Sequence, residues 1–183
     1  MSEISANTWW LQMTAPPTPE EKTKILPEGC LVMQAVKPTR SFYLFLYTSV
    51  GRPYQWYNRL MIPAGELDRL LQDEKTTVWV LYVNGVPAGF AEFDATITGE
   101  TEMVYFGLTC EFTGKGLGMP FLKWCIHKAW EQPLSRLWLH TCDLDHPAAL
   151  HMYRKAGFAI YDQDTLMQQK PDPEDDPYLL LPW

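Results

Sequence analysis

Three alternating glycines constrain the fold of this chain more than any other feature. They lie within residues 111–122, EFTGKGLGMPFL, between a run rich in β-branched and aromatic residues at 101–108 and a run whose apolar residues recur at helical spacing. The pattern predicts a strand, a glycine turn and a helix. A helix N-terminus presents unpaired N–H groups and the positive end of its dipole, and glycine lets oxygens approach those groups closely. We therefore expect the loop to bind an anion, and above all a diphosphate.

The spacing of the glycines excludes two common nucleotide-binding loops. A P-loop requires Gly-x-x-x-x-Gly-Lys-Ser/Thr, whereas Lys115 is followed by Gly116. A dinucleotide fingerprint requires Gly-x-Gly-x-x-Gly, whereas Gly114, Gly116 and Gly118 alternate. Neither nucleotide-binding fold is supported.

The loop resembles the acetyl-CoA loop of the GNAT acyltransferase superfamily, written Gln/Arg-x-x-Gly-x-Gly/Ala. The six places are filled by Thr113, Gly114, Lys115, Gly116, Leu117 and Gly118. Gly116 and Gly118 match the two required glycines, while Thr113 departs from the usual first residue, which affects one side-chain contact but not the backbone cradle. The resemblance implies that residues 113–118 bind acetyl-CoA. Lys115 and Lys123 are expected either to contact its phosphates or to face solvent.

A second block, HPAALHMYRKAGF at 146–158, resembles the late helix and following strand of the same superfamily, written Asn-x-x-Ala-x-x-x-Tyr-x-x-x-Gly-Phe. The matching residues are Ala149, Tyr153, Gly157 and Phe158, and His146 stands where asparagine is common. Asp145 is expected to cap this helix. The resemblance covers roughly residues 76–162 and implies that His146, Ala149 and Tyr153 lie against the cofactor.

The remaining patterns predict a single α/β domain over residues 1–183, with 46% apolar and 20% charged residues. Asn84-Gly85 is the strongest hairpin signal, joining strands at 76–83 and 86–95. An antiparallel meander followed by β-α-β-α-β predicts a mixed sheet with helices on both faces, which the GNAT resemblance also implies. Residues 1–75 are expected on the acceptor side. Further strands are predicted at 7–13, 30–36, 101–110, 134–141, 158–162 and 178–181, and helices at 41–47, 54–61, 63–71, from the loop to 130, and from 146.

Acetyl transfer to an amine needs a base for the ammonium proton, a donor to the oxyanion and an acid for the departing thiolate. Glu102 is the first candidate for the base, because it lies on the strand before the loop, where some GNAT enzymes have a catalytic glutamate. We expect it to share a strand face with Val104, Phe106 and Leu108. The alternative is that Glu102 is a charged residue at the end of a strand, in contact with solvent and without a catalytic role. Glu92 is the second candidate, with a surface or substrate-binding role as the alternative, and His140 is the third.

The other two demands fall on backbone and on a tyrosine. Gly107 is expected either to permit a bulge that frees the Leu108 N–H for the oxyanion or merely to allow close packing. A splayed strand would also offer groups of Phe106 and Leu108 to the pantetheine amides. Tyr153 is the expected acid, because the family's tyrosine at this place lies near the departing sulfur. The alternative for Tyr153 is a packing residue whose hydroxyl is hydrogen-bonded.

Charge and cysteine usage limit the partners. The net charge of −7 and the absence of a basic run argue against nucleic acid, and no signal peptide or membrane-length apolar run is present, so we expect a cytoplasmic protein. The four cysteines form no Cys-x-x-Cys pair and are expected to be reduced. No metal site is expected, because His146 and His151 lie about 140° apart on a helix and His140 and Cys142 lack further ligands. The acidic stretch at 172–176 fits a solvated loop or an acidic rim for a cationic amine.

The leading hypothesis is therefore an acetyl-CoA-dependent N-acetyltransferase that acts directly on a primary amine of a small, cationic molecule, as a monomer or homodimer. Arg52, Trp56 and Arg59 are expected either to line the acceptor cleft or to pack in the core. Two alternatives stay open: a non-catalytic acyl-CoA-binding module, and a protein or peptide N-acetyltransferase.

Overall fold

A seven-stranded mixed sheet organises the computed structural model, which describes residues 2–18 and 26–180. The strand order is β2-β3-β4-β5-β6-β1-β7, and among these described strands the β5–β6 pair is parallel and the other five pairs are antiparallel. The bounds are β1 (Ser2–Met13), β2 (Cys30–Gln34), β3 (Thr76–Val83), β4 (Val86–Asp94), β5 (Glu100–Leu108), β6 (Arg136–Cys142) and β7 (Ala159–Lys170).

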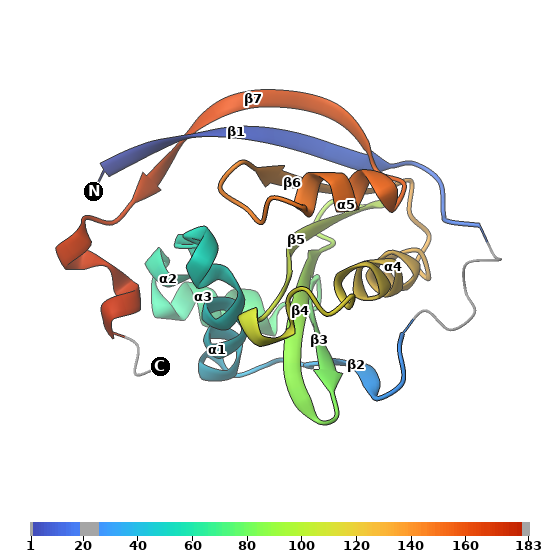
Figure 1. The fold of residues 1–183 in the computed structure, drawn as a ribbon, viewed down its shortest axis with the longest axis horizontal. Coiled ribbons are helices and arrows are strands. Elements are labelled where there is room, and N and C mark those ends of the chain that lie inside the picture. The colour runs from blue at the N-terminus through green and yellow to red at the C-terminus, as the bar shows by residue number, and fades with distance from the viewer. Residues whose placement is uncertain (1, 19–25, 181–183) are drawn as a thin grey trace.

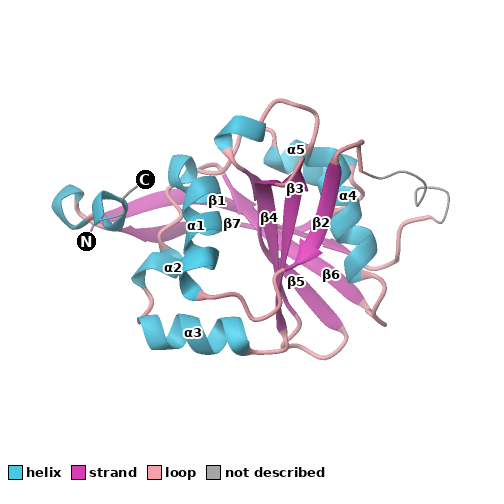
Figure 2. Cartoon of the chain, turned by 90° about the horizontal axis from the view of Figure 1, so that it is seen from below, coloured by secondary structure: helices cyan, strands magenta, loops and turns pink. Residues whose placement is uncertain are grey.

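Helices cover both faces of this sheet (Figures 1 and 2), so the predicted fold class is confirmed. One face packs against α4 (Gly118–Ala129) and α5 (Ala149–Lys155) through a cluster that includes Leu139 and Phe121. The other packs against α1 (Arg40–Gly51) and α3 (Ala64–Gln72) through a separate cluster that includes Tyr43 and Phe90. The short helix α2 (Asn58–Met61) and the 3-10 helix η2 (Arg52–Tyr54) join α1 to α3.

The predicted hairpin of β3 and β4 is confirmed. Val83 pairs with Val86 across a two-residue turn, in which Asn84 and Gly85 both have positive φ, 50° and 84°. Positive φ at both residues is typical of a type I′ turn, whose twist matches the right-handed twist of paired strands. Local chemistry therefore determines this part of the sheet.

The N-terminal strand β1 lies between β6 and β7, a place that the sequence pattern did not predict. Residues from Thr8 to Met13 pair with β6, while residues from Ser2 to Gln12 pair with β7. Beyond the end of β6, β1 and β7 therefore form a two-stranded ribbon, which arches over the helices of the second face (Figure 1).

The C-terminal end differs from its prediction. A strand was expected at 178–181, but residues Pro177–Leu180 form a 3-10 helix, η5, and residue 181 lies outside the described residues. The Asp176 carboxylate accepts from the Tyr178 N–H at 2.9 Å and turns the chain. The Tyr178 hydroxyl donates to the carbonyl of Trp56 at 2.7 Å, and Arg52 donates to the Tyr178 carbonyl at 3.1 Å. The chain end thus packs on the segment between α1 and α2.

Candidate active site

The candidate active site lies where β5 and β6 stop pairing. Glu102 and Trp138 are the last paired residues, although β5 continues to Leu108 and β6 to Cys142. Beyond this point no described strand pairs with the facing edges of β5 and β6, so their N–H and C=O groups are open to an extended ligand. A sequence can show that two strands exist, but not where they part.

A β-bulge in β5 begins the separation. Met103 pairs with Phe93 and Tyr105 pairs with Glu92, so Val104 is an extra residue. A bulge changes which face the following side chains occupy. Met103 and Phe106 both pack in the α4 cluster, whereas Glu102 lies on the opposite face, so the expectation that Glu102 shares a face with Phe106 and Leu108 is wrong.

Gly107 is not the bulge residue. It pairs in register with Phe90, and a Cβ at this position would lie 2.4 Å from Cγ1 of Val50, so the alternative role in close packing is confirmed. Thr109, two residues on, donates its N–H to the carbonyl of Ala88 at 2.9 Å. Since alternate residues of a strand point their backbone groups to opposite edges, the N–H groups of Leu108 and Phe106 point toward the gap.

The glycine loop leaves a series of N–H groups open. Gly114 and Gly116 have φ of +77° and +76°, and a Cβ at either would meet no atom within 4 Å. Within residues 26–180, the N–H groups of residues 114–119 have no hydrogen-bond acceptor, and Leu117 precedes α4 without a side-chain cap. The helix end and the loop together form a cradle of backbone donors suited to a diphosphate.

Met152 brings the second sequence block to this cradle. A Cβ on Gly118 would lie 3.3 Å from Sδ of Met152 in α5 and 3.9 Å from Leu108. The loop, α5 and the end of β5 are therefore neighbours. Lys115 lies beside them with its Nζ 5.1 Å from the centre of the Phe112 ring.

Glu102 and His140 face each other across the beginning of the gap. Nδ1 of His140 lies 3.2 Å from Oε1 of Glu102, and the side chains are 48% and 20% exposed. Two of the three candidates for the base are thus brought together at a place that solvent reaches. A carboxylate hydrogen-bonded to an imidazole can take a proton and pass it on.

Glu92 is placed differently from its prediction. Its side chain is 1% exposed and is held by the Tyr43 hydroxyl and by the Arg59 guanidinium, so it is neither at the surface nor open to substrate. Burial disfavours the charged form of Arg59, but the neighbouring Glu92 carboxylate favours it, and the pKa of the Arg59 guanidinium is raised. Burial and then Glu92 also raise the pKa of Tyr43. This cluster holds α1 and α2 on β4.

Tyr153 lies beside the unpaired part of β5. It is 7% exposed, and its ring packs edge-on against Phe106 at 6.3 Å and Phe158 at 6.2 Å. The Tyr153 hydroxyl forms no hydrogen bond with any described residue. The hydroxyl of a buried tyrosine that serves only for packing normally has such a partner. Burial, and secondarily Asp145, raise the pKa of this phenol, so it is protonated at neutral pH.

The turn into α5 uses side chains in ways that the sequence did not predict. The helix begins at Ala149, three residues after His146, and Asp145 does not cap it. Asp145 instead accepts from the Thr141 hydroxyl at 2.8 Å and the Cys142 N–H at 3.1 Å. Nδ1 of His146 accepts from the Ala148 N–H at 3.1 Å, as the side-chain oxygen of an asparagine would.

Trp56 connects the two sides of the gap. Its indole N–H donates to Asp145, after β6, at 3.1 Å, while its ring lies 5.0 Å from that of Tyr105 on β5. The segment between α1 and α2 therefore crosses the open end of the site. No sequence signal linked Trp56 to Asp145, because the contact joins residues 89 positions apart.

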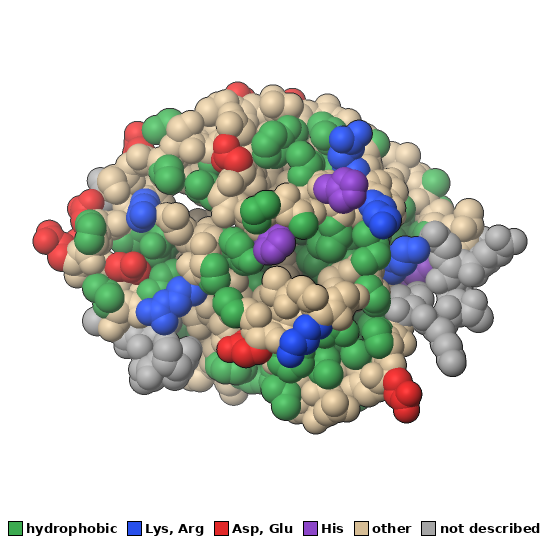
Figure 3. All heavy atoms as spheres, viewed as in Figure 1, with side chains coloured by type: hydrophobic (Ala, Val, Ile, Leu, Met, Phe, Trp, Pro, Cys, Tyr) green, Lys and Arg blue, Asp and Glu red, His purple; other side chains and the backbone are tan. Residues whose placement is uncertain are grey.

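Charge is distributed unevenly around this arrangement. Lysine, arginine and histidine side chains gather over α5 and the adjoining part of α4, whereas acidic side chains gather around the C-terminal turns (Figure 3).

An open hollow of about 790 Å³ beside α5 is lined by His151, Arg154, Lys155, Phe158, Ala159 and Ile160, outside the cradle and the gap. Across the described segments, no three His, Cys, Asp or Glu residues are grouped as metal ligands, and no described helix is long and apolar enough to cross a membrane.

Comparison with known proteins gives one family match. Residues 40–158 match the sequence model of the acetyltransferase (GNAT) family. No curated protein matches the sequence.

Solved structures share the fold at low identity. A functionally unknown conserved protein from Staphylococcus epidermidis ATCC 12228 is 15% identical with a TM-score of 0.63, over 90% of this chain and 62% of its own. A GCN5-related N-acetyltransferase from Sphaerobacter thermophilus is 18% identical with a TM-score of 0.61, over 91% and 52%. A GNAT family acetyltransferase from Elizabethkingia anophelis, with acetyl-CoA bound, is 19% identical with a TM-score of 0.57, over 74% and 80%. The chain thus spans less than two thirds of the first two proteins.

Proposed function

The chain belongs to the acetyltransferase (GNAT) family, and on this premise we propose that it transfers the acetyl group of acetyl-CoA directly to a primary amine of a small, cationic molecule. The observation that carries the proposal is the run of open N–H groups at 114–119, next to the point where β5 and β6 separate. Those groups would hold the diphosphate, and the edges of Phe106 and Leu108 would pair with the pantetheine amides as a neighbouring strand does.

Glu102 is the proposed base. It removes a proton from the acceptor ammonium, directly or through a water molecule, and the free amine then attacks the thioester carbonyl. His140, whose Nδ1 lies 3.2 Å from that carboxylate, then carries the proton on to solvent.

Leu108 and Tyr153 complete the reaction. The Leu108 N–H, which points into the gap, donates to the oxyanion that develops on the carbonyl oxygen. Tyr153 donates its proton to the sulfur as the carbon–sulfur bond breaks. The attacking nitrogen loses its second proton as the amide forms, and this proton, carried by solvent, restores the Tyr153 hydroxyl. The products are the acetylated amine, free CoA and the proton that Glu102 removed.

A small cationic acceptor is favoured by charge. The chain carries a net charge of −7, and Glu102 is a partly exposed carboxylate at the reaction point. A negative field concentrates cationic substrates near such a site.

Release of free thiol from acetyl-CoA, measured with a panel of polyamines, amino sugars, amino-acid derivatives and peptides, tests the proposal. We expect turnover with at least one small cationic amine and a loss of kcat in Tyr153→Phe; full turnover in that variant removes Tyr153 from the mechanism. Turnover with peptides alone would identify a peptide acetyltransferase. CoA binding by calorimetry, without turnover on any amine, would identify a binding module.

A further inference from the structure

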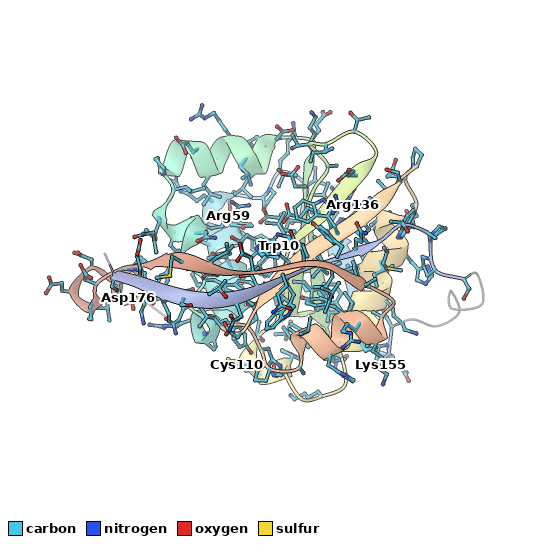
Figure 4. The ribbon with its side chains drawn as sticks, turned by 90° about the horizontal axis from the view of Figure 1, so that it is seen from above. Trp10, Arg59, Cys110, Arg136, Lys155 and Asp176 are labelled. Carbon is cyan, nitrogen blue, oxygen red and sulfur yellow. The ribbon has the colours of Figure 1, made fainter. Side chains whose placement is uncertain are left out.

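A tryptophan to which no role has been assigned lies beside His140, the residue that contacts the proposed base. Trp10 on β1 is the antiparallel partner of His140 on β6, whose imidazole contacts Glu102. Directly opposed residues have Cβ atoms about 5 Å apart on the same face of the sheet. Figure 4 shows Trp10 on the same side of the β1/β7 ribbon as Arg59, away from Cys110 and Lys155.

The indole of Trp10 does not serve the core. Its neighbour Trp9 packs against the α4 cluster, whereas Trp10 belongs to neither apolar cluster and is partly exposed. Among the described residues, no ring, cation or hydrogen-bond acceptor contacts Trp10. By contrast, Trp138 on the same face has the Arg136 guanidinium 5.5 Å from its ring centre. A partly exposed indole without a ring or cation of the described residues against it, close to the proposed base, is suited to contact a ligand.

The charges around Trp10 indicate which ligand. Asp162 on β7 pairs with Trp10 from the other edge of β1, and it is exposed. The indole therefore lies between two carboxylates, those of Glu102 on β5 and of Asp162 on β7. With strands about 4.8 Å apart, the row from β5 to β7 spans on the order of 15 Å. An indole face attracts a cation, and adjacent carboxylates strengthen that preference.

We propose that Trp10 is a specificity-determining residue: the acceptor lies across β6 and β1 with a second positive charge on the indole of Trp10, so the preferred substrates are di- or polyamines. This rests on the proposed function. The reacting amine meets Glu102, while the chain of the substrate extends over His140 toward Asp162. The N-terminal strand thus supplies part of the acceptor site.

Steady-state kinetics with an α,ω-diamine and the n-alkylamine of equal chain length test the inference. We expect Trp10→Leu to raise the diamine KM roughly threefold to thirtyfold, the loss of one cation–π contact. The KM for acetyl-CoA and for the monoamine should change less than twofold, and Asp162→Asn should raise the diamine KM in the same direction. Trp9→Leu is the matched control, because it removes an indole from the same strand on the opposite face.

The inference is overturned if Trp10→Leu leaves the diamine KM unchanged, if the monoamine KM rises equally, or if Trp9→Leu has the same effect on the diamine. Rejection of the diamine by the wild-type protein, while other amines are acetylated, also overturns it without affecting the proposed function. Absence of thiol release with every amine contradicts the proposed function itself.

Discussion

At the residue scale, Glu102 and His140 form a hydrogen bond at the point where β5 and β6 separate. In Glu102→Gln the side chain keeps its shape but can no longer take a proton, so we expect kcat to fall by roughly 10² to 10⁴. Binding of CoA, measured by calorimetry, should be unchanged because the cradle at 114–119 is untouched. Turnover within twofold of wild type would show that the proton leaves by another route.

Gly116 offers a second test at this scale. Its φ of +76° costs an alanine roughly 1–2 kcal/mol, and the added Cβ points into open space where a phosphate would lie. We expect Gly116→Ala to raise the KM for acetyl-CoA at least tenfold. Gly85→Ala is the matched control, since Gly85 has a φ of +84° and open space but lies in the β3–β4 turn. Equal kinetic effects in both variants would contradict a cofactor role for the loop.

Residues of the candidate site differ in how much local sequence signal they carry. The loop glycines were found from spacing, because positive φ and helix entry are local requirements. Val104 gave no signal, since a bulge depends on the register that the neighbouring strand imposes. Trp10 gave none either, because its closeness to His140 arises only when β1 pairs with β6.

At the scale of elements, the Arg59–Glu92 pair fixes α2 to β4. Removing one partner leaves the other as an uncompensated buried charge, so Arg59→Met should lower the free energy of unfolding by about 3–5 kcal/mol. The double variant Arg59→Met/Glu92→Leu should recover most of that loss, because no buried charge remains. Urea denaturation of the wild type, Arg59→Met, Glu92→Leu and the double variant measures this coupling. Additive losses would show that the two side chains act independently.

Elements with local signals were predicted well, and those decided by distant partners were not. The β3–β4 hairpin follows from Asn84-Gly85. The strand expected at 178–181 is wrong because Asp176 turns the chain and Tyr178 finds its partners near Trp56, far away in sequence. Likewise, the position of β1 between β6 and β7 depends on which strand edges remain open, which no single segment encodes.

For the whole molecule, buried tyrosine hydroxyls on both faces of the sheet make the free energy of unfolding depend on pH. Burial raises the pKa of tyrosines in both clusters and at the C-terminal turn, namely Tyr43, Tyr47, Tyr105, Tyr153 and Tyr178. The folded protein therefore keeps these protons at a pH where the unfolded chain, with an ordinary pKa of about 10, releases them. The stability associated with these groups is present in full below about pH 10 and is lost as the pH rises toward their folded pKa values.

We accordingly expect the free energy of unfolding to fall steeply above about pH 10, by about 1.4 kcal/mol per pH unit for each buried tyrosine. Urea denaturation between pH 8 and 11 measures the slope, and tyrosinate absorbance should appear together with loss of structure. Tyr153→Phe should make the slope shallower by about one tyrosine's share, since phenylalanine releases no proton. A flat profile through pH 11, or tyrosinate formation in the folded protein, would show that solvent reaches these phenols without unfolding.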